Sequence, residues 1–448
     1  MGNLGLSIAA TGINASQTAM DNIAENLANT NTPGYVDQTA NLTASAMVGP
    51  YAVGGGVSVT SITQANDAIL ATNSNQTQGS LAQSTALQQV LQQAQMAFQN
   101  PSSTSGLSND LSNFWQSWDQ VTANPSSSAA RQGVIDSAQT VVSDLSQATT
   151  QLQSTTAGAS AQLTSTVSQV NGYLTQMAQL NSQIVLAKSS GGSINSLMDQ
   201  RNAVMTDLAS SIGATGVSQP DGSLLVQVGG VTLVQTNWSD TVALKSTGGV
   251  TQLVAQTSNV TVNPSSGTTA GLMAAVNQYL PGFQTQLDAV ANNLASTVNT
   301  QLAAGFTATG AAGQALFTGT GAGGIAVNPA LVTDPTLIAA ASTSSLPAAT
   351  NDGSNAQAIA NLYNSPGGPD ATYRTLVQNV GDQVAAVNDS VTSNTSLANT
   401  AKQNLQAAVG VNQNNELVSL MNFQQTYQAA AKVISTVDSA VQSLLNAV

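Results

Sequence analysis

The 448-residue chain is long enough for two or three domains, and its 42% apolar residues can bury a core. Its net charge is −13, and its seven basic residues begin only at Arg131, so it lacks the Lys and Arg clusters that bind nucleic acids or anionic membranes. It has no Cys and no His, which excludes disulfides, thiolate nucleophiles, the common zinc ligand sets and the usual general base near neutral pH.

The N-terminal segment is predicted to form a helix from Leu4 to Leu27. Its apolar residues recur every seven positions, with one further seam residue between them: Leu6, Ile13, Met20, Ile23 and Leu27. The helix should stop before Thr32-Pro33-Gly34-Tyr35, because Pro disfavours helical geometry in the residue before it and Gly permits a turn. Residues 36 to 65 read as extended and loop-like. The first residues lack the features of a cleaved secretory signal, so we expect export, if it occurs, by another route.

The middle of the chain alternates between helical and strand patterns. Helical spacing is found at 66–98, 107–121 and 129–188, and again after Gly191-Gly192 up to Leu208. The segment from Leu224 to Val234 predicts a hairpin around Gly229-Gly230, and strand-like runs continue to Val262. Helix returns at 272–302, residues 303–370 are rich in Gly, Ala, Pro and Thr, and a looser helical pattern covers 373–409.

The C-terminal segment, from Glu416 onward, has a strict seven-residue repeat. Its seam residues are Leu420, Phe423, Tyr427, Ile434, Val437, Val441 and Leu444, and the pattern runs to Val448. A chain end normally frays unless something holds it, so this seam predicts a partner. Glu416 is expected in the first helical turn, after an Asn412 or Asn414 cap, where a carboxylate suits the helix dipole.

These patterns predict a mainly α fold with a β-rich insertion, divided into discontinuous domains. Residues 1–35 and 410–448 would form a terminal coiled-coil assembly domain. Residues 36–212 and 270–409 would form a long, rod-like helical middle domain with the loop-rich section 303–370, and residues 213–269 an outer β-rich insertion. The apolar seams at both ends are the predicted assembly interface, because helices so placed, with small polar outer faces, pack against neighbouring copies.

Both ends also carry motifs. The stretch from Asn22 to Tyr35 (NIAENLANTNTPGY) resembles the N-terminal signature of the flagellar rod, hook and hook-associated proteins, and the tail from Glu416 to Leu445 resembles their C-terminal signature. The presence of both at their proper ends identifies a resemblance to flagellar axial proteins. It implies that one turn is a family motif: Asn29, Thr32, Pro33, Gly34 and Tyr35.

Further segments are similar to the first hook-associated protein family. They are Gly410-Val411-Asn412, the run from Leu197 to Asn202, Asp221-Gly222-Ser223, and the residues between Pro281 and Phe317. Two departures put charge-dependent contacts in question. Val36-Asp37-Gln38 stands where the family commonly has a Ser-Arg-Gln type sequence, and Gln413-Asn414-Asn415 replaces acidic residues.

The resemblance implies a structural function. The chain would be exported through the flagellar type III apparatus and would be secreted to the extracellular flagellum. There it would assemble with copies of itself as a short helical ring that connects hook to filament. Its other partners would be the hook protein, the second hook–filament junction protein and an export chaperone that binds the C-terminal segment.

Two alternatives remain open at this stage. One is a hook or distal rod protein, which is expected to have a different lead-in to the C-terminal helix. The other is a secreted flagellar protein with an enzymatic insert, but the Asp residues are sparse and Gly319–Gly324 lacks the Lys and following helix of a phosphate loop. We predict no catalytic residue, no cofactor, no metal, and neither nucleic-acid nor membrane partners.

Overall fold

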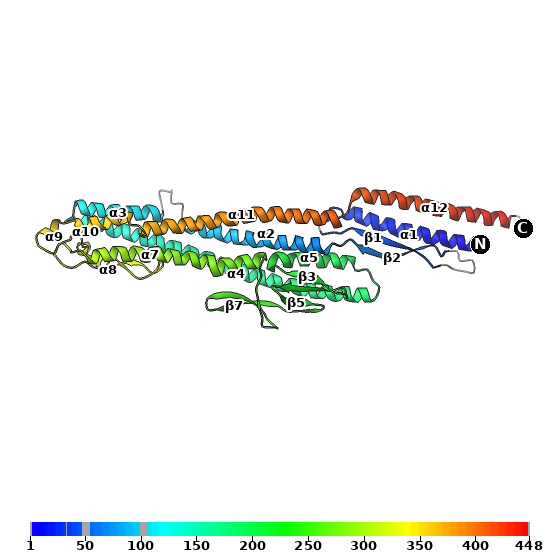
Figure 1. Ribbon diagram of the computed structural model, residues 1–448, viewed down its shortest axis with the longest axis horizontal. Helices are drawn as coiled ribbons and strands as arrows, with labels where there is room; N and C mark the ends of the chain where they lie inside the picture. The colour runs from blue at the N-terminus through cyan, green and yellow to red at the C-terminus, as the bar shows by residue number, and fades with distance from the viewer. Residues whose placement is uncertain (1, 33, 47–53, 99–105, 447–448) are drawn as a thin grey trace.

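A computed structural model describes residues 2–32, 34–46, 54–98 and 106–446 of the chain. The molecule is elongated: long helices form a rod, strands lie along one side of it, and both chain ends lie at the same end (Figure 1). This arrangement confirms the predicted fold class, mainly α with a β-rich insertion. The division into three domains with the boundaries given above stays a prediction.

Long helices that run side by side build the rod. Their bounds are α2 Ala68–Gln95, α4 Ser128–Ser189, α5 Asn195–Ile212, α7 Leu280–Ala303 and α11 Pro369–Val409, with η1 Met96–Phe98 and α3 Leu107–Ala123 toward the far end. The longest, α4, has 62 residues and therefore spans roughly 90 Å at 1.5 Å per residue. Side-chain caps fix two of the starts: Asp67 accepts from the N–H of Leu70 at 2.9 Å, and Ser127 from that of Ala130 at 3.2 Å.

The rod has a continuous apolar core. Along α4, the apolar residues at helical spacing are fully buried, among them Leu145, Leu163 and Leu174. At the far end, the ring of Phe114 lies 4.9 Å from that of Trp115 and 5.8 Å from that of Phe317, in tilted or edge-on geometry. The helical spacing of the sequence therefore reports a real core stripe.

The prediction of one regular helix at 272–302 is wrong in one respect, because a π-helical turn divides the α-helix in two. The segment consists of α6 Gly267–Ala274, one π-helical turn η2 Ala275–Tyr279, and α7. Pro281 lies in the first turn of α7 and has no N–H to donate. The N–H of Leu280 bonds the carbonyl of Ala275, five residues back, so the wider turn accommodates the Pro within a continuous helical path.

The loop-rich section covers the end of the rod away from the chain termini (Figure 1). It contains short elements only: β10 Phe317–Thr318, β11 Ala326–Val327, α8 Pro329–Thr333, η3 Pro335–Leu337, α9 Ala348–Asn351, α10 Ser354–Ala360 and η4 Asn361–Asn364. Arg131 ties this section to α4. Its buried guanidinium donates to the carbonyls of Pro125, Thr336 and Ile338, so that its charge is not left without acceptors.

The strands on the side of the rod form two small antiparallel sheets. The first is β3 Thr215–Ser218, β4 Leu224–Val228, β5 Val231–Gln235 and β6 Trp238–Ser239, and the second is β7 Val242–Thr247, β8 Val250–Ala255 and β9 Thr261–Val262. Val228 pairs with Val231 across Gly229-Gly230, which confirms the predicted hairpin. Both glycines have positive φ, +55° and +82°, as this tight turn requires.

Asparagine side chains dock these sheets on the helices. Asn181 of α4 donates to the carbonyl of Leu224 at 2.8 Å and accepts from its N–H at 2.9 Å. Asn171 holds Val242, and Asn277 holds Thr251, in the same two-bond manner. Each amide takes the place of a neighbouring strand and satisfies backbone groups that would otherwise lose water without a partner.

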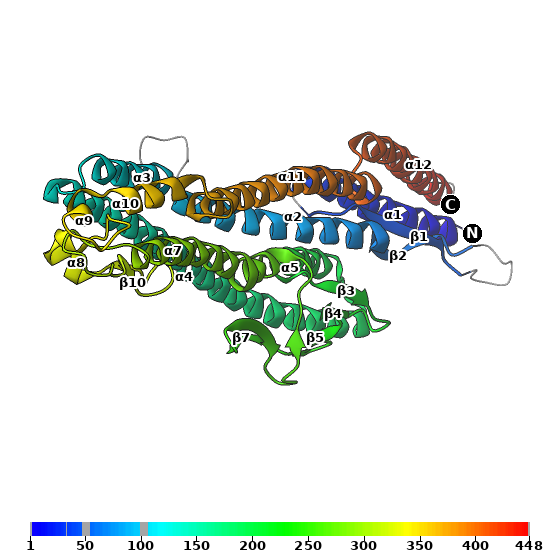
Figure 2. The same ribbon diagram turned by 60° about the vertical axis from the view of Figure 1, so that its left-hand side comes forward.

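At the other end of the rod lie the terminal helices, α1 Gly2–Asn29 and α12 Gln413–Leu445 (Figure 2). The segment expected to be extended and loop-like is extended in two strands that form an antiparallel hairpin, β1 Gln38–Ala44 and β2 Val57–Gln64, which lies against α1. The side chain of Asn22 donates to the carbonyl of Gln38 at 2.6 Å, and the N–H of Val57 donates to Thr11 at 3.3 Å.

Candidate assembly interface

The two terminal helices pack against each other at a point where neither has a bulky side chain. A Cβ placed on Gly12 of α1 would lie 3.8 Å from the Cβ of Ala430 in α12, which is ordinary contact. Small residues at a crossing let two helix backbones approach closely. The pair thus joins the first and last helices of the chain into one unit.

The predicted seam residues of α1 lie at different depths. Ile23 is buried, Ile13, Met20 and Leu27 are half-buried, and Leu6 is 40% exposed. Buried small residues such as Ala15 and Ala19 fill the rest of the covered surface, where the hairpin and α12 lie. Among the seam residues of α1, Leu6 is therefore the most exposed and Ile23 the most buried.

The predicted seam residues of α12 are less covered. Leu420, Phe423, Ile434 and Val437 are half-buried, Tyr427 is 37% exposed, Val441 is 45% exposed, and the side chain of Leu444 lies outside the described residues. In the isolated chain, α1 therefore covers only part of this seam. That the residues of both seams form contacts between copies stays a prediction.

The helix α12 also exposes large apolar side chains outside the seam, which the heptad analysis missed. They are Leu417, Val418, Met421, Val433 and Leu445, with exposed fractions of 48% to 72%. Among the described side chains of this 33-residue helix, Glu416 is the one that is buried. The four-residue spacing of Leu417 and Met421 was the available signal for a second apolar face.

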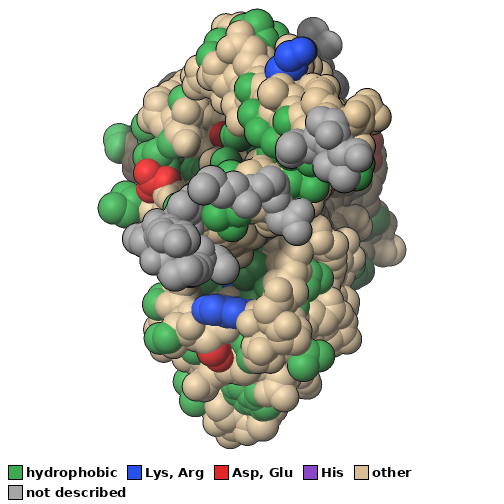
Figure 3. Space-filling model, turned by 90° about the vertical axis from the view of Figure 1, so that its right-hand side faces the viewer, with side chains coloured by type: hydrophobic (Ala, Val, Ile, Leu, Met, Phe, Trp, Pro, Cys, Tyr) green, Lys and Arg blue, Asp and Glu red, His purple; other side chains and the backbone are tan. Residues whose placement is uncertain are grey.

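Seen end-on, the molecule shows few charged side chains among hydrophobic and neutral polar ones (Figure 3). The whole chain has only 6% charged residues. Apolar surface with few charges around it loses its water at little cost in free energy when another protein approaches. Such surface commonly marks a contact between proteins.

The predicted motif turn follows α1 directly. The N–H of Thr32 donates to the carbonyl of Asn29 at 2.8 Å. The N–H of Tyr35 donates to the carbonyl of Thr32 at 3.2 Å. Gly34 has φ +83°, a conformation that L side chains rarely adopt. Pro33 lies outside the described residues. The turn reverses the chain so that Tyr35 returns to the helix it has just left.

Asn26 of α1 organises this corner. It accepts from the hydroxyl of Tyr35 at 2.9 Å and donates to the Asp37 carboxylate at 2.7 Å. It also donates to the carbonyl of Gln38 at 2.8 Å. Burial, followed by the nearby carboxylates of which Glu25 acts most strongly, raises the pKa of Tyr35 to about 12, so its hydroxyl remains a donor at any physiological pH.

The start of α12 packs into the same corner. Asn412 is its cap, as expected, and accepts from the N–H groups of Asn414 and Asn415 at 3.1 and 3.3 Å. Glu416 lies in the first turn, again as expected, but its carboxyl is turned inward toward Asn26 and Asp37. Burial raises the pKa of Glu416, and it raises that of Asp37 as well.

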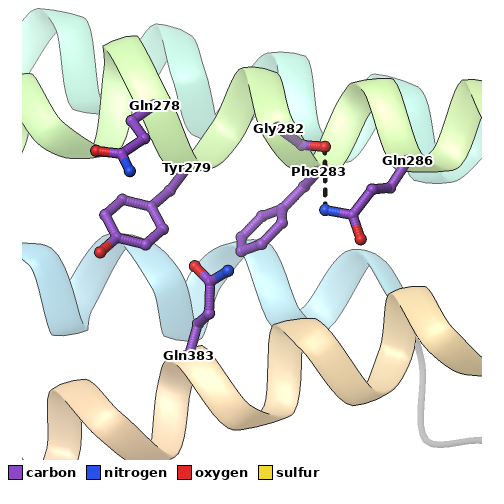
Figure 4. Close-up of a pocket in the computed structure, with 6 residues that line it drawn as sticks. All are labelled: Gln278, Tyr279, Gly282, Phe283, Gln286 and Gln383. Carbon is purple, nitrogen blue, oxygen red and sulfur yellow. Dashed lines mark hydrogen bonds between the residues drawn. The ribbon is translucent and has the colours of Figure 1, made fainter.

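Two hollows beside α7 are lined by neutral side chains. A small cavity of about 80 Å³ lies between η2, α7 and α11, lined by Gln278, Tyr279, Gly282, Phe283, Gln286 and Gln383 (Figure 4). Another hollow nearby is lined by Gln286, Ala289, Gly367, Ala371, Thr372, Thr375 and Leu376, and like the first it has no carboxylate in its lining. Neither offers a carboxylate pair for acid–base chemistry.

The Gly319–Gly324 loop is occupied by a carboxylate of the chain itself. Asp288 accepts from the N–H of Ala322 at 2.8 Å, and Asn292 accepts from that of Gly321 at 2.8 Å. These N–H groups are the ones that a phosphate would need. Within the described ranges, no group of three or more acidic side chains is placed to hold a metal ion, and no helix there is long and apolar enough to span a bilayer.

The ends of the chain match models of flagellar axial proteins. Residues 6–35 match the flagella basal body rod protein family, and residues 403–447 match the C-terminal region of the flagellar basal body rod FlgEFG proteins. Together with the paired terminal helices on a helical rod, these matches define the class: an axial component of the bacterial flagellum.

The matches over the middle of the chain narrow this class. Residues 91–317, more than half of the chain, match the helical domain of the flagellar hook-associated protein FlgK. The chain therefore belongs to the FlgK family of flagellar hook-associated proteins.

Individual relatives are consistent with membership in this family. Flagellar hook-associated protein 1 of Salmonella typhimurium is 26% identical, over 98% of each chain, and that of Bacillus subtilis is 24% identical, over 99% of this chain and 98% of the relative. The structure is similar to that of the flagellar hook junction protein FlgK from Burkholderia pseudomallei, with a TM-score of 0.64 and 20% identity over 74% of this chain and 99% of the other.

Proposed function

We propose that this chain is a structural protein that assembles with copies of itself into a short helical ring, which connects the flagellar hook to the filament. The observation that carries this proposal is α12, a helix of 33 residues whose apolar side chains are mostly half-covered or exposed in the single chain. Burying them against neighbouring copies supplies the free energy of assembly, at roughly 25 cal/mol per Å² of apolar surface.

The shape of the chain supports a layered ring. The paired terminal helices lie at one end of the rod, and the sheets lie on its side (Figures 1 and 2). In the ring, the terminal helices of all copies form the inner tube, the rods form the next layer, and the sheets face outward. Each contact is heterologous, because a surface of one copy meets a different surface of the next.

The predicted partners follow from this place in the flagellum. The hook protein lies below the ring, and the second hook–filament junction protein lies above it. Before assembly, the exposed apolar surface of α12 requires protection, so an export chaperone binds the C-terminal segment. The chain passes through the flagellar type III apparatus and acts outside the cell. Its work is mechanical, and no residue is assigned a catalytic role.

Electron microscopy of cells tests this function. In cells without the gene for this chain, we expect hooks of normal length that carry no filament, and flagellin released into the medium. Expression of the intact chain should restore filaments, and gold-labelled antibody should mark one band between hook and filament. Normal filament numbers in the deletion cells, or a label spread along the hook, would contradict the proposal.

A further inference from the structure

Three elements and a turn meet where the terminal helices join the rod. Asp37 lies at their centre: its N–H donates to the carbonyl of Val409, the last residue of α11, at 2.9 Å. Its own carbonyl accepts from the N–H of Ala65, just after β2, at 2.8 Å. Its carboxylate accepts from Asn26 of α1 at 2.7 Å. This corner is therefore the joint between the rod and the terminal helices.

Glu416 closes the joint from the side of α12. It is only 8% exposed, and its carboxyl lies against Asn26 and Asp37. Its Oε2 atom is buried and has no hydrogen-bond partner among the described residues. A buried carboxylate oxygen without a hydrogen-bond donor costs free energy. Asp37, its neighbour, cannot donate to it while both carboxyls are ionised, because an ionised carboxylate only accepts hydrogen bonds. A hydrogen bond between the two requires that one of them is protonated.

The charges around the joint are negative. Glu25 of α1 and Asp199 of α5 act, with Asp37 and Glu416, on Tyr35 in the same corner. Asp199 is held by Gln64 of β2, and the guanidinium of nearby Arg201 donates instead to the carbonyl of Gly222.

The basic residues nearest to Glu416 in sequence lie on α11 and α12, the two helices that adjoin the joint. The nearest are Lys402 of α11 and Lys432 of α12, 14 and 16 residues from Glu416 in sequence. At 1.5 Å per residue, Lys432 lies roughly 24 Å from Glu416 along α12, and Lys402 lies about 10 Å along α11 from Val409, which bonds Asp37. Neither lysine is among the groups that shift the pKa of Asp37 or Glu416. A proton is therefore the positive charge suited to this site.

We propose that Asp37 and Glu416 form a proton-binding site, in which one shared proton bridges the two carboxyls and fixes α12 to the end of the rod. With the proton present, one carboxyl donates a hydrogen bond to the other. The buried Oε2 atom of Glu416, which otherwise has no partner among the described residues, then takes part in a hydrogen bond. Without it, two carboxylates face each other in a half-buried site and repel. The joint then loosens, and α12 can change its direction relative to the rod.

The direction of the pH effect follows from both raised pKa values. A carboxyl whose pKa is higher in the folded than in the unfolded chain stabilises the fold below its unfolded pKa, and this contribution is lost as the pH rises through the folded one. Burial is the main cause that raises the pKa of both Glu416 and Asp37. The joint should therefore be firm in mild acid and loose at alkaline pH.

Distances between spin labels can measure this on the isolated chain, independently of any ring. The sequence has no Cys, so Ser393→Cys on α11 and Ser439→Cys on α12, both exposed, give one label pair across the joint. Labelled chain, diluted with unlabelled chain, is measured at about pH 5, where ordinary carboxyls are ionised, and at about pH 8. We expect one narrow distance distribution at the lower pH and loss of this narrow component at the higher pH.

Two variants replace the proton by a permanent donor. Glu416→Gln and, separately, Asp37→Asn should keep the narrow distribution at both pH values, because an amide N–H bridges the pair without titrating. Glu25→Gln, an exposed carboxyl on the neighbouring helix, is the matched control and should retain the response of the parent chain. Equal distributions at both pH values in the parent chain, or an unchanged pH response in both amide variants, would overturn the proposal.

Discussion

The rod and the helix α12 use apolar residues in opposite ways. Along α4, 21 side chains are buried, and several of the largest have no exposed surface at all. On α12, Glu416 is the buried residue among the described side chains, while Met421 is 55% and Leu445 72% exposed. Both helices show periodic apolar residues in sequence, so periodicity alone does not say whether a stripe is filled by the same chain or by another.

The difference separates two tasks that the sequence performs. The rod residues stabilise the fold of a single chain, because their apolar side chains are already buried within it. The α12 residues leave much of their apolar surface exposed in the single chain, and under the proposed function this surface is buried only when copies meet. Substitutions in the rod should therefore change the stability of the monomer, whereas substitutions in α12 should change assembly.

The largest effect on the monomer is expected in the rod core. Leu174→Ala removes a fully buried side chain of α4 and should lower the free energy of unfolding by about 2–5 kcal/mol, because it leaves a cavity. Leu417→Ala on α12, where the side chain is 49% exposed, is the matched control and should change it by less than about 0.5 kcal/mol. Urea unfolding of both variants measures the difference, and equal losses would remove the contrast between the regions.

A smaller effect is expected where the sheets dock on the rod. Asn181→Ala leaves the N–H and carbonyl of Leu224 without partners in a site where Asn181 is fully buried. The loss should be about 1–3 kcal/mol, and hydrogen exchange of the β4 amides should rise. Unchanged protection of β4 would mean that the amide bonds do not hold the sheet in place.

The rod also has a pH dependence of its own. Burial, and then the adjacent Asp110 carboxyl, raise the pKa of Asp144 to about 7. Its stabilising contribution is present below the unfolded pKa near 4 and is lost as the pH rises through about 7. Asp144→Asn should abolish this loss, so that between about pH 5 and 8 the variant gains up to about 1 kcal/mol over the parent chain, an amount kept small by solvent screening.

Thermal unfolding across this pH range measures the effect. Asp119→Asn, which neutralises an exposed carboxylate on α3, should leave the pH dependence as it is. The raised pKa of Asp144 would be contradicted if, between about pH 5 and 8, the melting temperature of the parent chain fell no more steeply than that of Asp144→Asn.

The smallest effect on the monomer, and the largest on the assembled flagellum, is expected in α12. Ile434→Asp introduces a charge at a half-covered position, where the single chain can still hydrate it, so the free energy of unfolding should fall by less than about 1 kcal/mol. Between copies the same charge would be buried, which costs several kcal/mol, so filaments should be lost. Electron microscopy of complemented cells checks this against Ser439→Asp, and full filaments with Ile434→Asp would exclude the seam from the interface.

The sequence predicted most helices because their signals are local. Apolar spacing located α2, α3 and α4, and the turn after Asn29 and the glycines at 229–230 were placed correctly. The π turn at 275–279 was missed, because it depends on how Pro281 is accommodated in a helix that continues on both sides of it. Its residues have no composition that distinguishes them from ordinary helix.

The joint at Asp37 could be predicted only in part. Position and cap placed Glu416 in a first helical turn, where a carboxylate is normally solvated and interacts with the helix dipole. Its burial against Asp37, far away in sequence, arises only when the first and last helices pair. Long-range contacts of this kind leave no periodic trace in the sequence, although the unusual Asp at position 37 was visible as a departure from the family pattern.

The asparagine pairs that hold the sheets have a consequence for the medium in which the protein works. Asn171, Asn181 and Asn277 form their bonds through neutral amides, and salt screens charges but leaves such bonds nearly unaffected. The attachment of the sheets should therefore be the same in fresh water as in brine.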